Sequence, residues 1–433
     1  MELDGTEKQI IMGGCSSKAS YLPEDILEQI LCRLPEKPLV RFKSVSKAWR
    51  SLISQICLRY PRRSVLGLVL RTHKVLRHCG SIIEYIARTS RHPCLTHFIS
   101  DHLPEKWYTM RESIPGHYLS IEERNGGPKL LAWEECLGSS KLPFKPSPDD
   151  LVSCCNGLLL FVDIETSRYY VSNPMTGQCV PIPQPAWAQE RLLFAALAFD
   201  PSRSSSYAVV RFAWHTTKPD MVLDVYTSAD KIWSSHELQL DPCMTRLNMM
   251  RPATYFEGAL FRLSLTWHVV RFDFSRELAG VCAAPLPLSY KQCKGLMGSM
   301  GVLAGKLCYS NEFEDVLHVW SLGDCSLDVK SSLWELRYRI DIYDLTRSMV
   351  LSGDCWPPIS KWVETVAFHP SANVLYLGTP RVILTYDLES NELEELTRIE
   401  RDGFLPGCYC AAFTCVRFPV PFDEAGNICA PNC

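Results

Sequence analysis

The chain has 433 residues, of which 46% are hydrophobic and 21% charged, and its formal net charge is −3. This composition allows a large core and excludes an intrinsically disordered protein. Because the early apolar run 65–70 is broken by Gly67 and falls far short of the ~20 residues that cross a bilayer, we expect no signal peptide, no membrane partner and a soluble protein of the cytoplasm and/or nucleus.

Helical periodicity dominates the segment 20–63, which follows a polar stretch, 1–19, predicted to be a flexible tail. Pro23 suits the first turn of a helix, where its missing N–H costs nothing, and Pro35 ends the apolar stripe that follows. A short second helix around Leu39 and a third helix are predicted next. The apolar positions of the third helix are Val45, Ala48, Trp49, Leu52 and Ile53.

Three short helices cannot enclose a core of their own in about 40 residues. Their apolar faces must therefore be covered either by the rest of the chain or by another protein. The span 37–77 adds a charge preference, because it holds eleven lysines and arginines and no acidic residue. Subtracting these eleven charges from −3 leaves −14 on the rest of the chain, so the span favours an acidic partner, whether protein or nucleic acid.

The order and spacing of the apolar and proline residues in this segment are specific. The residues concerned are Leu22-Pro23, Ile30-Leu31, Leu34-Pro35, Leu39, Arg41, Val45-Ser46-Lys47, Trp49-Arg50 and Leu52-Ile53. Together they closely resemble the F-box, in the form common in plants. The alternative is an ordinary helical subdomain that packs on the rest of the chain.

The resemblance implies binding to a Skp-type adaptor and, through it, to a cullin scaffold. Carried over to this sequence, it predicts the adaptor-binding residues Leu22, Pro23, Ile26, Leu39, Val45 and Trp49. It also implies that Leu27, Leu31 and Leu52 mostly hold the helices together.

Short strand-like runs replace the helical pattern over residues 64–420. Turn residues followed by apolar runs recur in five units, near 151–187, 195–240, 253–287, 296–340 and 363–400. Such units favour a β-propeller, with a sixth blade from 65–150 and the run 411–418 helping to close the ring. The predicted fold class is therefore α+β, with a three-helix F-box, a mainly β domain expected to be a six-bladed β-propeller, and a C-terminal tail, 421–433.

Two segments of this β domain resemble the F-box-associated, kelch-like domain of plant F-box proteins. They are Cys154-Cys155-Asn156-Gly157-Leu158-Leu159 and Ser172-Asn173-Pro174-Met175-Thr176-Gly177. The resemblance implies that the β domain binds a target protein.

Two Trp-His pairs mark a candidate target site in the β domain. Trp214-His215 and Trp267-His268 both fall between the two central strands of successive units. These connections lie on one face of a propeller, where an exposed tryptophan would dominate binding energy. The alternative is that each tryptophan fills a gap between blades, as large aromatic residues commonly do.

The sequence lacks the motifs of a catalytic or metal-binding protein. The cluster of His92, Cys94 and His97 matches no zinc spacing, and no phosphate loop or nucleophile elbow occurs. The twenty cysteines are scattered through apolar runs and are expected to be buried thiols. We therefore predict no catalytic residue, no metal and no cofactor.

These observations together predict a non-catalytic adaptor subunit of an SCF-type ubiquitin ligase, whose helices bind a Skp-type adaptor and whose β domain binds a target. Two alternatives stay open. One is a propeller-type carbohydrate-binding protein or enzyme with a structural helical appendage. The other is a nucleic-acid-binding protein that uses the basic span; we expect no nucleic-acid partner because no docking element for base readout is found.

Overall fold

The structure of the protein is a computed structural model of the 433-residue chain. The residues that it describes are 23–33, 41–59, 65–74, 117–120, 129–132, 142–144, 146, 150–163, 165–185, 194–214, 221–241, 252–275, 279–289, 292, 298–323, 334–345, 363–378, 382–398, 406–416, 418 and 420–429.

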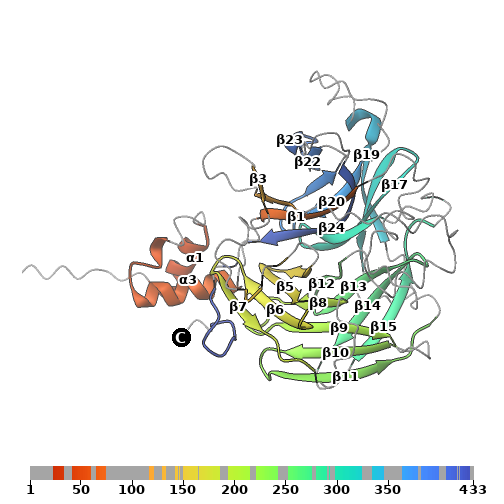
Figure 1. The fold of residues 1–433 in the computed structure, drawn as a ribbon. Coiled ribbons are helices and arrows are strands. Elements are labelled where there is room, and N and C mark those ends of the chain that lie inside the picture. The colour runs from red at the N-terminus through yellow and green to blue at the C-terminus, as the bar shows by residue number, and fades with distance from the viewer. Residues whose placement is uncertain are drawn as a thin grey trace, which may run out of the picture. The chain divides into compact units, whose positions relative to one another are not determined.

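The chain divides into two compact units, Met1–Ile56 and Cys57–Cys433, referred to below as the helical unit and the β domain. The helical unit contains α1 (Glu24–Arg33) and α3 (Lys47–Arg59) (Figure 1). Between them only Arg41 and Phe42 are described as helical, so the three-helix arrangement stays a prediction. Neither α1 nor α3 is both long and apolar enough to span a bilayer.

Both helices begin where the sequence supplies a suitable first turn. The N–H of Leu27 donates to the carbonyl of Pro23 at 3.0 Å, which closes the first turn of α1. Ser46 caps α3, because its hydroxyl oxygen accepts a hydrogen bond from the N–H of Trp49 at 3.1 Å and its carbonyl accepts one from Arg50. Local sequence therefore fixes both helix starts.

In the part of the β domain that the structure describes, the strands form six four-stranded antiparallel sheets. Five of them are each built from consecutive strands and coincide with the five predicted units, which confirms that prediction. The strands are β4 (Leu151–Cys155), β5 (Leu158–Asp163), β6 (Arg168–Asn173), β7 (Gln178–Pro181); β8 (Ala195–Ala198), β9 (Ala208–Trp214), β10 (Met221–Thr227), β11 (Ile232–Leu238); β12 (Thr254–Phe256), β13 (Ala259–Ser264), β14 (His268–Phe274), β15 (Ala279–Pro285); β16 (Ser299–Leu303), β17 (Lys306–Phe313), β18 (Val316–Leu322), β19 (Trp334–Asp341); and β20 (Glu364–Phe368), β21 (Val374–Gly378), β22 (Val382–Asp387), β23 (Leu393–Arg398).

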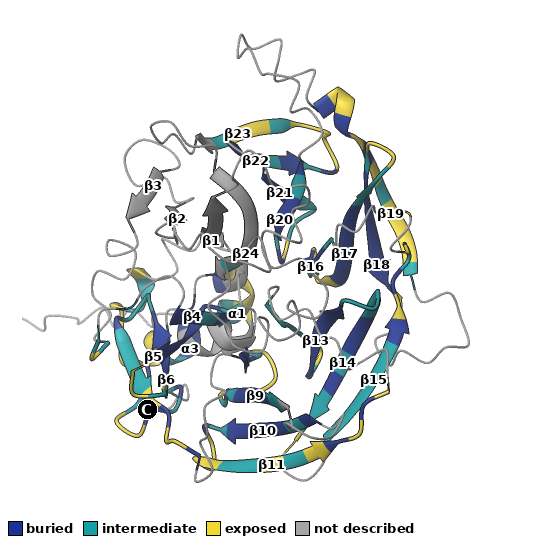
Figure 2. Ribbon diagram, turned by 45° about the vertical axis from the view of Figure 1, so that its right-hand side comes forward, coloured by how far each residue is buried: buried dark blue, intermediate teal, exposed yellow. Residues whose placement is uncertain are grey.

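The five sheets of consecutive strands are arranged around a common centre, with strands such as β16 and β20 inside and β11, β15, β19 and β23 at the periphery (Figure 2). The arrangement is that of a β-propeller, in which each sheet built from four consecutive strands is one blade. Successive blades pack face to face, because side chains from both faces of each sheet are buried against its neighbours.

The sixth sheet combines the two ends of the β domain. Its strand order is β24 (Pro406–Val416), β1 (Val65–Lys74), β2 (His117–Ser120) and β3 (Lys129–Ala132). The antiparallel register pairs Val65 with Val416 at one end of the two long strands and Lys74 with Pro406 at the other. The predicted region 65–150 thus supplies three strands of this sheet, and the predicted closing run 411–418 lies largely in the fourth.

Tight turns explain why the blades repeat in the sequence. In Asn156-Gly157, Glu257-Gly258 and Ala304-Gly305, both residues have positive φ, between 44° and 91°. Positive φ at both central residues is the type I′ pattern, whose twist matches that of the flanking antiparallel strands. Each of these pairs joins the first two strands of a blade, as the sequence pattern predicted.

Two tryptophans tie neighbouring blades together at their outer strands. The indole N–H of Trp233 in β11 donates to the carbonyl of Pro183, just after β7, at 2.7 Å. In the same way the indole N–H of Trp334 in β19 donates to the carbonyl of Pro285 at the end of β15, at 2.9 Å. These latches satisfy proline carbonyls next to the ends of outer strands, where no further strand neighbour follows.

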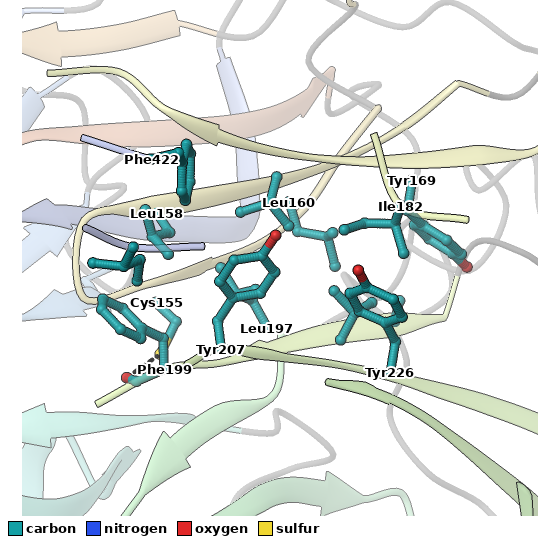
Figure 3. Packing of buried hydrophobic residues seen from close by; sticks show 14 of the residues in the cluster. Cys155, Leu158, Leu160, Tyr169, Ile182, Leu197, Phe199, Tyr207, Tyr226 and Phe422 are labelled. Carbon is teal, nitrogen blue, oxygen red and sulfur yellow. Dashed lines mark hydrogen bonds between the residues drawn. The ribbon is translucent and has the colours of Figure 1, made fainter. Parts of the chain in front are cut away.

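The segment after β24 packs on the propeller. Phe418, Val420, Phe422 and Ile428 are between 2% and 4% exposed and belong to the cluster of buried residues between the blades β4–β7 and β8–β11, part of which Figure 3 shows. The region assigned to a C-terminal tail, 421–433, therefore includes two core residues, Phe422 and Ile428. Their burial depends on residues more than 200 positions away, as the hydrogen bond from Gln178 to Phe422 illustrates.

A buried ion pair crosses the blade β8–β11. Arg211 and Asp224 face each other on neighbouring strands, and an Nη of Arg211 lies 3.1 Å from a carboxylate oxygen of Asp224. Both side chains are at most 3% exposed. The hydroxyl of Ser235 donates a further hydrogen bond of 2.5 Å to the carboxylate.

We predict that Asp224→Asn destabilises the β domain by about 3–5 kcal/mol, because it leaves the guanidinium of Arg211 buried without its counter-charge. The double change Arg211→Met and Asp224→Leu is expected to recover most of this loss, since it removes both charges together. Urea unfolding followed by tryptophan fluorescence measures both variants. Equal stability of Asp224→Asn and the unmodified protein would contradict the prediction.

Candidate functional site

Helix α1 has one buried and one exposed apolar stripe. Leu31 is 1% exposed, whereas Ile26 is 38% and Ile30 is 43% exposed. Ile26 and Ile30 are four residues apart and therefore lie one above the other on the same face. An exposed apolar stripe of this kind on a short helix is suited to contact with another molecule.

The same division occurs at α3. Leu52 and Ile53 are 6% and 0% exposed, whereas Val45, in the turn before the helix, is 57% exposed. Trp49 is half-buried, and its ring packs edge to face on that of Phe42 with centroids 5.6 Å apart. The helical unit thus buries part of its apolar surface and leaves another part uncovered.

The structure places four of the six residues predicted to bind the adaptor. Pro23, Ile26 and Val45 are exposed and Trp49 is half-buried, while Leu22 and Leu39 lie outside the described residues. Adaptor binding by these residues stays a prediction, but the exposed ones have the accessibility that it requires.

Leu31 and Leu52, which the resemblance assigned to holding the helices together, are buried, and Leu27 is half-buried. Ile30 was not among the residues predicted to bind. Its exposure makes it a further candidate, and the signal was present in the sequence, four positions after Ile26 on the same stripe.

Exposed positive charge lies near Val45 and along α3. Arg41, Lys47 and Arg50 are exposed, and the first turn of α3 contains no acidic residue. The exposed surface of the helical unit therefore combines apolar side chains with cations, which fits a partner that is acidic around an apolar contact.

In the β domain, Trp267 lies in the tight turn between β13 and β14 and has a φ of 65°. Its N–H donates to the carbonyl of Ser264, and its carbonyl accepts a hydrogen bond from the N–H of Leu286, both at 2.9 Å. The side chain is half-buried and packs against a cluster that unites the blades β12–β15 and β16–β19. The ring thus fills part of the gap between two blades and keeps some exposed surface.

The other members of the predicted target site are placed in part. His268 is the half-buried first residue of β14, and one of its ring nitrogens lies 2.8 Å from the carbonyl of Thr266. Trp214 is the last residue of β9, but its side chain and the whole of His215 lie outside the described residues. The connections β9–β10 and β13–β14 occupy equivalent places in their blades. Target binding by both pairs stays a prediction.

Cys179 and Cys308 are free thiols in apolar surroundings. Burial raises the pKa of the thiols of Cys179 and Cys308 to about 12, so that both stay protonated at neutral pH and are poor nucleophiles. The buried thiol of Cys155 donates to the carbonyl of Phe199 at 3.2 Å. Within the described ranges no group of three or more His, Cys, Asp or Glu side chains could hold a metal ion, while His92, Cys94 and His97 lie outside them.

Comparison with known proteins gives two family matches that follow the two units. Residues 20–60 match the F-box domain, and residues 129–415, more than half of the chain, match the family described as F-box protein At3g26010-like, beta-propeller.

Three relatives from Arabidopsis thaliana illustrate the level of similarity. The F-box/kelch-repeat protein At3g23880 is 22% identical, with 77% of this chain and 80% of the relative covered. The F-box protein At5g07610 is 24% identical, covering 77% and 74% of the two chains. The F-box protein At3g26010 is 22% identical, covering 91% and 83%.

We predict that Leu31→Ala and Ile26→Ala act differently on α1. Leu31→Ala removes a fully buried side chain and should cost about 2 kcal/mol or more, which corresponds to roughly 30-fold faster amide exchange in α1 of the full-length chain. Ile26→Ala removes a side chain already 38% exposed and should change the exchange much less. Equal effects of the two variants would mean that the two stripes do not differ in role.

Proposed function

Because the chain belongs to the family of F-box proteins with an At3g26010-like beta-propeller, we propose that it is the substrate-recognition subunit of an SCF-type cullin ubiquitin ligase. In this proposal the helical unit binds a Skp-type adaptor, which connects it to a cullin scaffold. The β domain binds a target protein.

The observation that carries the proposal is the uncovered apolar surface of the helical unit. Ile26, Ile30 and Val45 are 38%, 43% and 57% exposed, while Leu31 and Ile53 are almost completely buried. Removing such apolar surface from water is the main driving force of protein association. The exposed cations Arg41, Lys47 and Arg50, near Val45 and in α3, add attraction to an acidic adaptor and increase the rate of encounter.

The proposed mechanism is proximity. The chain contributes no covalent step; it holds a target near a ubiquitin-carrying enzyme that the same complex binds, so that transfer to lysines of the target becomes effectively intramolecular. A rigid propeller is well suited to this task, because its blades present a fixed surface to the target.

Three finer points complete the proposal. We propose that the mixed sheet of β24, β1, β2 and β3 serves as the sixth blade of the ring, since it has the same four-stranded antiparallel form as the other five. We propose a third helix between α1 and α3, of which Arg41 and Phe42 form part. We also propose that the protein acts in the cytoplasm and/or nucleus, which the free thiols of Cys179 and Cys308 support.

The double variant Ile26→Ala and Ile30→Ala tests adaptor binding. We expect at least a tenfold loss of affinity for a purified Skp-type adaptor, about 1.4 kcal/mol, because both side chains would be buried in the contact. Ile232→Ala is the matched control: Ile232 is also an exposed isoleucine, 54% accessible, but it lies in β11 of the β domain. Calorimetry or surface plasmon resonance gives the affinities, and unchanged binding by the double variant would refute the proposal.

Target binding by the Trp-His pairs is tested with the double variant Trp214→Ala and Trp267→Ala. We expect it to lose the proteins captured from cells by the intact chain, while the adaptor is still captured. Trp233→Ala is the control, since it removes a tryptophan at the outer side of a blade and should leave capture unchanged. If the folded double variant retains its targets, or if the control loses them equally, these tryptophans do not form the target site.

A further inference from the structure

The chain after β24 forms a short extended segment that ends in a turn. Phe418, Val420 and Phe422 alternate along it, as expected for an extended strand that buries one face. A bridge between Phe422 and Ile428 then closes a turn, in which the N–H of Asp423 donates to the carbonyl of Asn427 at 2.7 Å. Below, residues 418–429 are called the clasp.

Asn173 anchors the first part of the clasp. This side chain is completely buried, and its amide nitrogen donates to the carbonyls of Phe418 and Val420, at 3.1 Å and 2.8 Å. Its amide oxygen accepts a hydrogen bond from the N–H of Met175 at 3.0 Å. Asn173 therefore satisfies two carbonyls of a segment that has no strand neighbour of its own in the sheets.

Gln178 anchors the turn of the clasp. Its side-chain nitrogen donates to the carbonyl of Phe422 at 3.0 Å, and its side-chain oxygen accepts from the N–H of the same residue at 2.8 Å. A primary amide that bonds both backbone groups of one residue takes the place of a neighbouring strand.

Two glycines allow close contact along the clasp. A Cβ atom added to Gly157 would lie 2.4 Å from the Cβ of Phe418 and 2.8 Å from the carbonyl oxygen of Val416. Gly426, with a φ of 81°, would place a Cβ 2.7 Å from a methyl group of Val180. Any larger residue at either position would push the clasp away from the blade β4–β7.

The clasp also reaches the next blade. The ring of Phe418 packs edge to face on Phe199, with centroids 5.0 Å apart, and the ring of Phe422 lies 6.1 Å from that of Tyr207. The hydroxyl of Tyr207 donates to the carbonyl of Gly426 at 3.4 Å. Phe199 and Tyr207 flank the connection between β8 and β9, so the clasp crosses from one blade to the next.

We propose that the clasp locks the closed ring. Its binding site is formed by the two segments that resemble the F-box-associated, kelch-like domain, 154–159 and 172–177. Gly157 and Asn173 are the residues of these segments that hold it. The clasp follows β24 directly in the chain. When the clasp is bound to the blade β4–β7, it holds β24 next to β1 and β4 and so keeps the first and last strands of the domain together. The β domain then becomes competent only when residues 418–429 are in place, whichever partner its surface binds.

Hydrogen exchange on the full-length chain tests this role, with Asn173→Ala as the main variant. We expect exchange to become at least tenfold faster in 418–429 and in β24 and β1, because two clasp carbonyls lose their donor. Strands β12–β19 should change much less. Asn373→Ala is the matched control, since the amide of Asn373 bonds only one exposed partner that the structure records, Glu389, across a turn of another blade.

A pair of truncations provides the second measurement. A chain that ends at Arg417 should lose protection in β1 and regain it when a synthetic peptide of residues 418–433 is added, whereas a chain that ends at Cys429 should behave like the intact protein. Unchanged protection of β24 and β1 in Asn173→Ala, a uniform increase in exchange over all blades, or no rescue by the peptide would overturn the proposal. Adaptor affinity is measured on the same samples and is expected to stay unchanged, so this test is independent of the proposed function.

Discussion

The pairing of β1 with β24 is the constraint on which the rest of the β domain depends. A chain of many short strands exposes unpaired N–H and C=O groups at every sheet edge, and closing the sheets into a ring leaves only short outer edges. Here the pairing that joins the two ends runs over the whole length of β1, from Val65 to Lys74. These hydrogen bonds join strands from opposite ends of the β domain, so forming them carries the entropic cost of closing a long loop.

Several local features offset that cost. The blades bury side chains on both faces, as in the cluster of Figure 3, where residues from β4–β7, β8–β11 and the clasp meet. Trp233 and Trp334 add indole hydrogen bonds between outer strands, and Asn173 fastens the segment after β24. Directed hydrogen bonds of this kind position the blades, while apolar burial supplies most of the stability.

The helical unit, unlike the β domain, leaves a large part of its apolar residues exposed. It is too small to bury all of its apolar residues, and the sequence divides them between a buried set, with Leu31 and Ile53, and an exposed set, with Ile26, Ile30 and Val45. The proposed function, in which the chain joins a ligase scaffold to a target, needs both kinds of unit. One unit must be completed by a partner, and the other must be rigid enough to hold a second partner in place.

The sequence by itself determined the features that depend on near neighbours. Helical periodicity and Pro23 predicted α1 and α3, and turn pairs such as Asn156-Gly157 predicted the five consecutive blades, because period and turn chemistry act over a few residues. Only the tertiary structure decided the features that depend on distant residues: the partner of β1, the burial of Phe422 beside Gln178, and the packing of Trp267 between two blades. The physical reason is that burial and strand pairing are set by whichever distant segment covers a residue, and no local pattern carries that information.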